Sequence, residues 1–478
     1  MTTTAARAAT AADGVDDLHR LTARDALALF RSRELSPVEL MEAVIRRAEE
    51  VEPAINAFPH TYYEEALESA RAAEARYAGA GPRPRALEGI PIVIKDETPI
   101  RGQPLTQASL IHRDDVAEHT AVVPDRAIRA GGIVHARGAT PEFSSAAFTH
   151  SRLYGITRNP WNTEYSPGGS TGGGAAALAS GSAMLATGSD IGGSIRIPAT
   201  FSGVVGFKPP YGRVPVEPPY NLDHFCHDGP LARTVSDCAL LQNVIAGPHP
   251  SDPVALRPKL RIPAELGGIE RWLIAYSLDL GYRVGPEVRA GVLAAVEGLR
   301  EAGAIVEEVE VGWTHEDVTA ATRAHFGAMF GGSVAAELRE HRDLMTPYTI
   351  RFGEEMAGVT MADYLRGMGI EVRIHAALAD IHRRYRALVG PGFGVPKLRA
   401  GDDCLDVEIY DMLLTAVFNV CSRSPVLSVP SGSTAEGVPT GVQIAGRPYE
   451  DVAVFRIAAA LERVRPWPRI ADPIVVAV

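Results

Sequence analysis

The stretch SPGGSTGGGAAALASGSAMLATGSDIGGSIRIP, residues 166–198, contains two serines set among glycines, Ser170 and Ser194. Glycine lets a backbone approach a ligand or another backbone closely, and it adopts torsions that other residues avoid. The turn DIGG that precedes Ser194 supplies successive backbone N–H groups, which is the arrangement needed to hold a developing oxyanion. No histidine lies between the two serines. The stretch therefore indicates a serine-based site whose base must come from elsewhere in the chain.

The first serine by itself allows other interpretations. Residues 168–172 match the GxSxG elbow of α/β-hydrolases, but that elbow follows a strand, and residues 158–167 have the composition of a loop. A phosphate-binding loop would need a Lys-Ser/Thr pair after the glycines, and none follows. Glycines that only permit tight packing of helix against sheet are a common alternative, which the second serine makes less favourable.

Short apolar runs alternate with helical patterns along the chain, which predicts an α/β fold with a mostly buried sheet. The run GIPIVIKDE (89–97) has strand character up to Lys95. Thr22 and Ser36 precede two helical patterns as N-caps, and Ser36 with Glu39 has the spacing of a capping box. Further strands are expected at 131–137, 184–187, 271–277, 304–311, 424–432 and 440–446, and helices at 22–32, 37–51, 63–79 and near 286–302.

We expect one large domain over residues 15–478, with a mixed β-sheet core flanked by helices, preceded by a disordered tail over 1–14. Residues from about 313 to 390 are rich in helical patterns and predict a helical cap inserted into this domain. The insertion and the loop LVGPGFGVPKL (388–398) are expected to line the substrate pocket. Their Phe, Met, Leu and Pro content favours apolar or aryl substrates.

Several motifs together resemble those of the amidase signature enzymes. The closest block is residues 166–209, and the other blocks are GIPIVIKD (89–96), TPEF (140–143), YGITRNPW (154–161), HDGPLARTVSDCALL (227–241) and GVPTGVQIAGRP (437–448). The resemblance covers the chain from about residue 20 to 465, which is nearly all of it. It implies the α/β fold already expected and a hydrolase that needs no cofactor.

The resemblance also implies a catalytic triad without histidine. The nucleophile is Ser194, the bridging serine is Ser170 and the base is Lys95, with a cis peptide bond between Gly169 and Ser170. A base must be uncharged to accept a proton, whereas a free lysine side chain titrates near pH ~10.4. Burial disfavours the charged form, and the apolar run IVI before Lys95 would supply that burial. Protons would then pass from Ser194 to Ser170 to Lys95 and return to the leaving amine, before water hydrolyses the acyl-enzyme.

The residues around the nucleophile receive supporting roles. The resemblance implies that backbone N–H groups of Ile191, Gly192, Gly193 and Ser194 form the oxyanion hole. Asp190 and Arg196 flank this turn, and we interpret them as a buried ion pair that fixes it.

Three positions depart from the family's common pattern. Thr171 replaces a second serine, Ala139 stands where many members carry asparagine, and Glu97 replaces the asparagine of the frequent Lys-Asp-Asn sequence. The last two changes alter the pocket or the residues around it, so no particular family member's substrate is expected here.

The composition limits the partners. A net charge of −11 disfavours a surface for nucleic acid or anionic membrane, since both attract basic faces. No run of 18 apolar residues predicts a membrane span. The four cysteines show no CxxC pair, which predicts free buried thiols and a reducing, cytoplasmic location. We expect a small amide, carbamate or ester as the only partner, and a monomer or homodimer.

One group of residues has the appearance of a metal site. His224, Cys226, His227 and Asp228 are close in sequence, but their spacing fits no standard zinc pattern. The segment also matches a family block without metal, so we predict no metal.

Two other functions share these motifs. The glutaminase subunit of a tRNA-dependent amidotransferase has the same triad, but such subunits usually carry Gln after the Ile-Arg of the nucleophile motif, where this chain has Ile197. A non-catalytic binding member of the fold is the second alternative, and the presence of all three triad residues disfavours it. The main hypothesis is cleavage of a C–N bond in an amide, with carbamates (a urethanase) and esters as related substrates.

Overall fold

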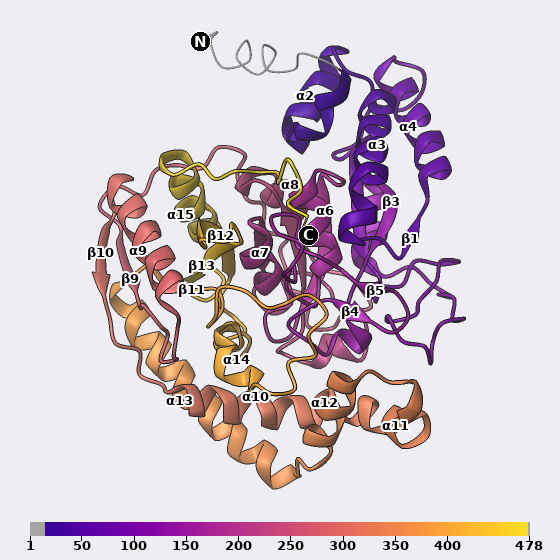
Figure 1. The fold of residues 1–478 in the computed structure, drawn as a ribbon. Helices are drawn as coiled ribbons and strands as arrows, with labels where there is room; N and C mark the ends of the chain where they lie inside the picture. The colour runs from indigo at the N-terminus through magenta and orange to yellow at the C-terminus, as the bar shows by residue number, and fades with distance from the viewer. Residues whose placement is uncertain (1–14, 477–478) are drawn as a thin grey trace.

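The computed structural model describes residues 15–476, so the predicted tail over 1–14 lies outside the described residues. A central sheet lies between layers of helices (Figure 1). The N-terminal helices cover one end of this arrangement, and a group of helices from the middle of the chain lies along the opposite end.

The sheet is mixed and has eleven strands in the order β1-β3-β2-β6-β8-β7-β12-β13-β11-β9-β10. Strand β2 is parallel to β3 and β6, and β9 is parallel to β10 and β11, whereas the central pairs are antiparallel. The strands are β1 His60–Thr61, β2 Pro91–Lys95, β3 Ile133–Gly138, β6 Leu185–Asp190, β7 Val205–Lys208, β8 His227–Ala232, β9 Leu273–Tyr276, β10 Ile305–Glu308, β11 Ala387–Pro391, β12 Val426–Ser433 and β13 Pro439–Gly446. Strands β4 His150–Ser151 and β5 Gly155–Ile156 pair separately. The predicted α/β fold, a single domain with a mixed sheet flanked by helices, is confirmed.

The N-terminal helices are α2 (Ala23–Ser32), α3 (Pro37–Ile55) and α4 (Tyr63–Tyr77). Thr22 caps α2 by accepting a hydrogen bond from the backbone of Asp25. Ser36 and Glu39 form the predicted capping box of α3, which satisfies backbone N–H groups that the helix itself cannot pair. The caps read from the sequence therefore set the starts of both helices.

Helix α6 (Gly172–Ser180) is buried along its whole length and packs against β2, β3 and β6. A side chain on Gly173 would bring its Cβ to 2.1 Å from the backbone nitrogen of Ala139. Only glycine permits this approach, so the run GGGAAALAS also serves the close packing of helix on sheet. The glycines needed for packing thus belong to the same segment as Ser170.

The remaining helices of the domain cover the two faces of the sheet. They are α5 Val122–Arg129, α7 Arg196–Ser202, α8 Val235–Ile245, α9 Pro286–Glu301, α14 Val417–Val420 and α15 Asp451–Val464. Short 3-10 turns occur at Val15–Arg20, Glu142–Ser144, Tyr220–Leu222, Arg342–Leu344, Ile409–Met412 and Leu414–Ala416. Strand β9, helix α9 and strand β10 form the predicted βαβ unit with parallel strands.

The helix-rich segment consists of α10 (His315–Met329), α11 (Gly331–His341), α12 (Pro347–Ala357) and α13 (Met361–Arg384), which lie together in Figure 1. The chain returns to the sheet through β11, so the expected end of the insertion near 390 was too late. The start of the expected loop 388–398 is likewise strand. Its Gly and Pro indicated a loop, but β9 and β13 pair with β11 on both sides and bury it.

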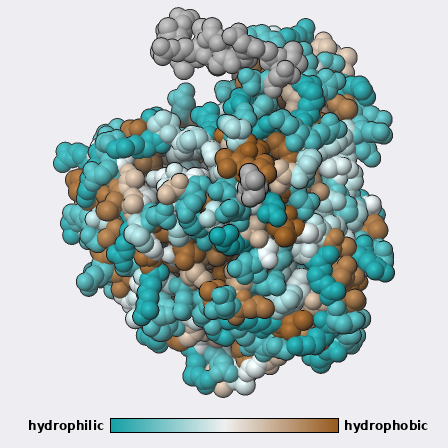
Figure 2. Space-filling view, in the orientation of Figure 1, coloured by the Kyte–Doolittle hydropathy of each residue, from teal (hydrophilic) through white to brown (hydrophobic). Residues whose placement is uncertain are grey.

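The surface of the protein and the state of its cysteines agree with what the composition predicts. Polar side chains cover most of the face in Figure 2, with apolar ones dispersed among them. Within residues 15–476, no helix combines the length and the apolar character needed to cross a bilayer. All four cysteines are free thiols, and Cys226 is the one that is only partly buried.

Candidate active site

The ends of two parallel strands bring the predicted site residues together. Lys95 is the last residue of β2, and Asp190 is the last residue of the neighbouring β6. Because parallel strands end at the same edge of a sheet, both side chains start from one edge. Ser170 lies just before α6, and Ser194 lies between β6 and α7. The segments that lead into helices α6 and α7 therefore place both serines at this edge of the sheet.

The side-chain nitrogen of Lys95 is at the centre of a buried polar network. Lys95 is 1% exposed, and its Nζ donates to Ser170 Oγ at 2.7 Å and to Ser189 Oγ at 2.9 Å. Glu97 Oε1 lies 2.9 Å from the same nitrogen. The sequence predicted that the side chain of Lys95 is buried, but it did not predict the ion pair with Glu97.

The carboxylate of Glu97 has several hydrogen-bond donors around it. It accepts hydrogen bonds from the hydroxyls of Ser144 and Ser189 in addition to the ion pair. Burial raises the pKa of Glu97, but attraction to Lys95 and the hydrogen bonds outweigh burial and leave this pKa below its usual value. The sequence marked Glu97 as a departure from the family pattern, yet its contact with Lys95 depends on how the chain turns after β2.

The two serine segments lie side by side. The peptide bond between Gly169 and Ser170 is cis, as expected. The backbone N–H of Thr171 donates to the carbonyl of Ser194 at 3.1 Å. Ser170 is fully buried and Ser194 is 8% exposed. Within the described residues the two hydroxyls make no direct hydrogen bond, and both face one cavity.

The turn before Ser194 has backbone N–H groups without acceptors among the described residues. Among the described residues, none accepts a hydrogen bond from the N–H groups of Ile191, Gly192, Gly193 or Ser194. Gly193 has φ of 133°, and a Cβ there would lie 2.1 Å from Thr415 Oγ1, so the turn requires glycine. Thr415 donates to the carbonyl of Gly192, which turns that peptide's N–H away from Thr415. The arrangement can therefore stabilise negative charge beside Ser194.

The predicted ion pair of Asp190 and Arg196 is present and fully buried, with 2.8 Å between the charged atoms. Arg196 also donates to Thr415 O at 2.8 Å, Gln443 Oε1 at 2.6 Å and Asn419 Oδ1 at 2.7 Å. Burial raises the pKa of Asp190, but the charge and hydrogen bonds of Arg196 and the hydrogen bond from Asn419 outweigh it, and the pKa is lowered to about 2. The pair fixes the turn on which Ser194 lies.

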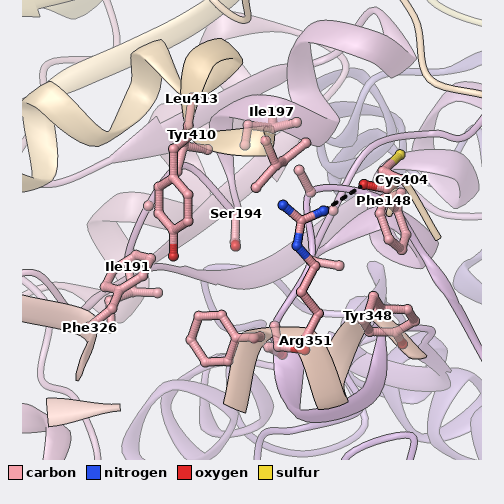
Figure 3. A pocket seen from close by; sticks show the side chains of 18 of the residues that line it. Phe148, Ile191, Ser194, Ile197, Phe326, Tyr348, Arg351, Cys404, Tyr410 and Leu413 are labelled. Atoms are coloured by element: carbon pink, nitrogen blue, oxygen red, sulfur yellow. Dashed lines mark hydrogen bonds between the residues drawn. The ribbon is translucent and has the colours of Figure 1, made fainter. Parts of the chain in front are cut away.

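One cavity at Ser194 is mainly apolar and has a volume of about 110 Å³ (Figure 3). Helices α10 and α12 contribute Phe326 and Tyr348, in keeping with the expected role of the insertion. The expected loop 388–398 does not line this cavity, whereas Asp403, Cys404, Glu408, Ile409, Tyr410 and Leu413 do. Arg351 enters the cavity but is bound to Glu355 at 2.8 Å and to three carbonyls of residues 404, 405 and 407. The apolar lining comprises Ala146, Ala147, Phe148, Ile191, Ile197, Phe326, Phe330, Tyr348, Phe352, Ile409, Tyr410 and Leu413.

A second cavity, of about 320 Å³, meets the first at Ser194 and Ile191. Its lining includes Ser170 and four residues with carboxyl side chains, which are Glu97, Asp190, Glu217 and Asp228. Ser194 therefore lies between an apolar cavity and an acidic one.

The four residues that have the appearance of a metal site do not converge. His227 is buried and bonded to the carbonyls of Phe225 and Ser422, while His224 is turned toward Glu371 at 3.1 Å. A different trio within the described residues, Asp223, His224 and His325, has ligand-type atoms within 4.8 Å of one another. His325 Nε2 and Asp223 Oδ1 are 2.6 Å apart, so a hydrogen bond accounts for this closeness.

Known proteins match the chain over most of its length. The family model described as Amidase matches residues 39–455. The acylamidase of Rhodococcus erythropolis is 34% identical, with 96% of this chain and 99% of that protein covered. A glutamyl-tRNA(Gln) amidotransferase subunit of Symbiobacterium thermophilum is 33% identical, with 91% of this chain and 95% of that protein covered. The crystal structure of a bacterial aryl acylamidase of the amidase signature family superposes with a TM-score of 0.87 at 28% identity, with 94% of this chain and 97% of that one covered.

Fold and matches together define an enzyme class, the hydrolases that act on the carbon–nitrogen bonds of amides. The chain belongs to the amidase signature family, as its motifs predict.

Proposed function

We propose that the protein hydrolyses small carboxamides with an apolar or aryl acyl group, through an acyl-enzyme on Ser194. The observation that carries the proposal is the buried Lys95 Nζ, 2.7 Å from Ser170 Oγ, beside a nucleophile whose turn has free backbone donors. Carbamates and activated esters belong to the same proposal, since each presents a carbonyl and a leaving group to the same nucleophile.

In the proposed relay, uncharged Lys95 accepts the proton of Ser170 while Ser170 accepts that of Ser194, whose oxygen forms a bond to the carbonyl carbon. The oxyanion binds to the N–H groups of residues 191–194. The C–N bond breaks as the proton returns from Lys95 through Ser170 to the departing amine. Water then attacks the acyl-enzyme and releases the acid, and Ser194 regains its proton.

The acyl group is assigned to the apolar cavity on energetic grounds. Burial of apolar surface contributes about 25 cal/mol per Å², so an aryl or alkyl acyl group gains affinity against this lining. The glutaminase alternative would bring the ammonium and carboxylate of glutamine into this space. Arg351 is the cation there, and it is already bound to neighbouring groups. The apolar lining, with Ile197 in it, therefore favours an amidase acting on apolar acyl groups.

Labelling with a fluorophosphonate and hydrolysis of an aryl amide such as benzanilide test the proposal. The wild-type protein is expected to be labelled at Ser194 and to turn over the amide, while Ser194→Ala loses the label and about 10⁴-fold or more of the activity. Ser32→Ala, which removes an exposed hydroxyl on α2, is the control and should match the wild type. Near-normal turnover by Ser194→Ala would overturn the nucleophile assignment. Ammonia release from glutamine by the isolated chain would favour the glutaminase alternative instead.

A further inference from the structure

The direction in which a substrate crosses the site follows from the position of Ser170. The departing amine must receive its proton from Ser170, so it has to leave on the side of that hydroxyl. Ser170 lines the second cavity and not the first, whereas Gly169 and Gly192 line the first and not the second. On the proposed function, the acyl group therefore occupies the apolar cavity and the amine occupies the acidic one.

The carboxyl groups of the second cavity differ in their partners. Glu97 is paired with Lys95, Asp190 is paired with Arg196, and Glu217 accepts from His119 Nε2 at 2.8 Å. Within the described residues, Asp228 has neither a hydrogen-bond donor to its carboxyl group nor a cation within ion-pair distance. It lies on β8 directly opposite Ser189, close to the reacting groups. Asp228 is thus the carboxyl of this cavity that lacks a counter-ion.

Among residues 15–476, no cationic side chain lines the cavity to neutralise Asp228. The lining contains neither lysine nor arginine. Burial, and secondly the charge of Lys208, lower the pKa of His227 to about 3, so this lining histidine is neutral. Burial raises the pKa of the Cys226 thiol, which is therefore neutral as well. Burial and the negative charges of Glu97 and Glu217 raise the pKa of Asp228 to about 8, despite the opposing effect of Lys95.

Asp228 is partly buried. A carboxylate withdrawn from water without a partner is costly, and a cation placed beside it recovers stabilisation through charge-assisted hydrogen bonds. The cavity that holds it opens directly onto Ser194, and it has room for a chain beyond the scissile nitrogen. We infer that this cavity selects amides whose amine half carries a second, cationic group, with Asp228 as the counter-ion for that group. The substrate class is thus an apolar or aryl acyl group joined to one nitrogen of a diamine. The inference rests on the proposed function and narrows it.

Three benzamides of similar length test the inference, because they share the acyl group and differ only at the far end of the amine. They are N-benzoyl-1,4-diaminobutane, which is cationic, N-pentylbenzamide, which is neutral, and N-benzoyl-4-aminobutanoate, which is anionic. At pH 8 to 9 we expect kcat/KM for the cationic amide to exceed that of the neutral one by about tenfold or more, and the anionic amide to be the poorest. A neutral amide hydrolysed as well as the cationic one by the wild-type protein would overturn the inference, whether or not any variant folds.

The variant Asp228→Asn assigns the preference to its residue. Its ratio of kcat/KM for the cationic over the neutral amide is expected to fall toward one, while the ratio in Asp114→Asn stays at the wild-type value. Asp114 is 87% exposed, so that control removes the same charge outside the cavity. An unchanged ratio in Asp228→Asn would overturn the assignment. Absence of hydrolysis of all three amides, together with an unlabelled Ser194, would instead overturn the proposed function, so the two failures are distinguishable.

Discussion

Replacing Glu97 by glutamine is the most informative change near the proposed base. The substitution keeps the size and one carbonyl oxygen of the side chain, but it removes a negative charge 2.9 Å from Lys95 Nζ. Attraction to Lys95 helps to hold the pKa of Glu97 down, so the two side chains interact favourably when both are charged. The proposed relay needs an uncharged amine, and Glu97→Gln removes the neighbouring negative charge that opposes it.

Coulomb's law gives the size of the effect. At 2.9 Å the attraction is about 6 kcal/mol with an effective dielectric constant of ~20, and about 1.4 kcal/mol with the value for bulk water. At ~1.36 kcal/mol per pH unit these limits correspond to about 4 and about 1 units. The rising limb of kcat/KM against pH is therefore expected to move down by at least about one unit in Glu97→Gln.

The assay is amide hydrolysis at low substrate concentration from pH 5 to 11, since kcat/KM reports groups of the free enzyme. Glu316→Gln is the matched control, because Glu316 has a side chain that is 73% exposed and should leave the profile unchanged. A rising limb that stays in place in Glu97→Gln, or moves to higher pH, would refute the reasoning that Lys95 must lose its proton against the field of Glu97.

Three further outcomes are expected. Lys95→Ala should lower amide hydrolysis much more than hydrolysis of an activated ester, because an amine needs a proton on departure and a phenolate does not; equal losses, with the alkaline-rising limb retained, would show that Lys95 is not the base. Asp190→Asn leaves Arg196 without its buried partner and should lower the free energy of unfolding by about 3–5 kcal/mol in urea melts, whereas Asp17→Asn at an exposed pair should cost less than about 1 kcal/mol. With a pKa near 2, Asp190 stabilises the fold above the unfolded-state pKa of about 4, and this contribution should decline as pH falls from about 4 toward 2. EDTA should leave amide hydrolysis unchanged, and strong inhibition would direct attention to Asp223, His224 and His325.

The sequence by itself determined the family, the fold class and the segments that carry the proposed site. A Cβ at Gly168, Gly169 or Gly173 would collide with backbone, and one at Gly193 would collide with Thr415. The spacing of the glycines therefore identifies the two serine turns without coordinates. Helix caps at Thr22 and Ser36 depend on residues three apart in the chain, which is why both helix starts could be predicted.

Contacts between distant segments were decided by the tertiary structure alone. Strand β11 could not be told from a loop, because its strand character comes from pairing with β9 and β13. The lining by residues 403–413 and the pairing of Glu97 with Lys95 depend on how loops fold back over the sheet edge, which no local pattern records. The isolation of Asp228 is of the same kind, since a missing counter-ion is a property of all the groups that surround a side chain and not of its neighbours in sequence.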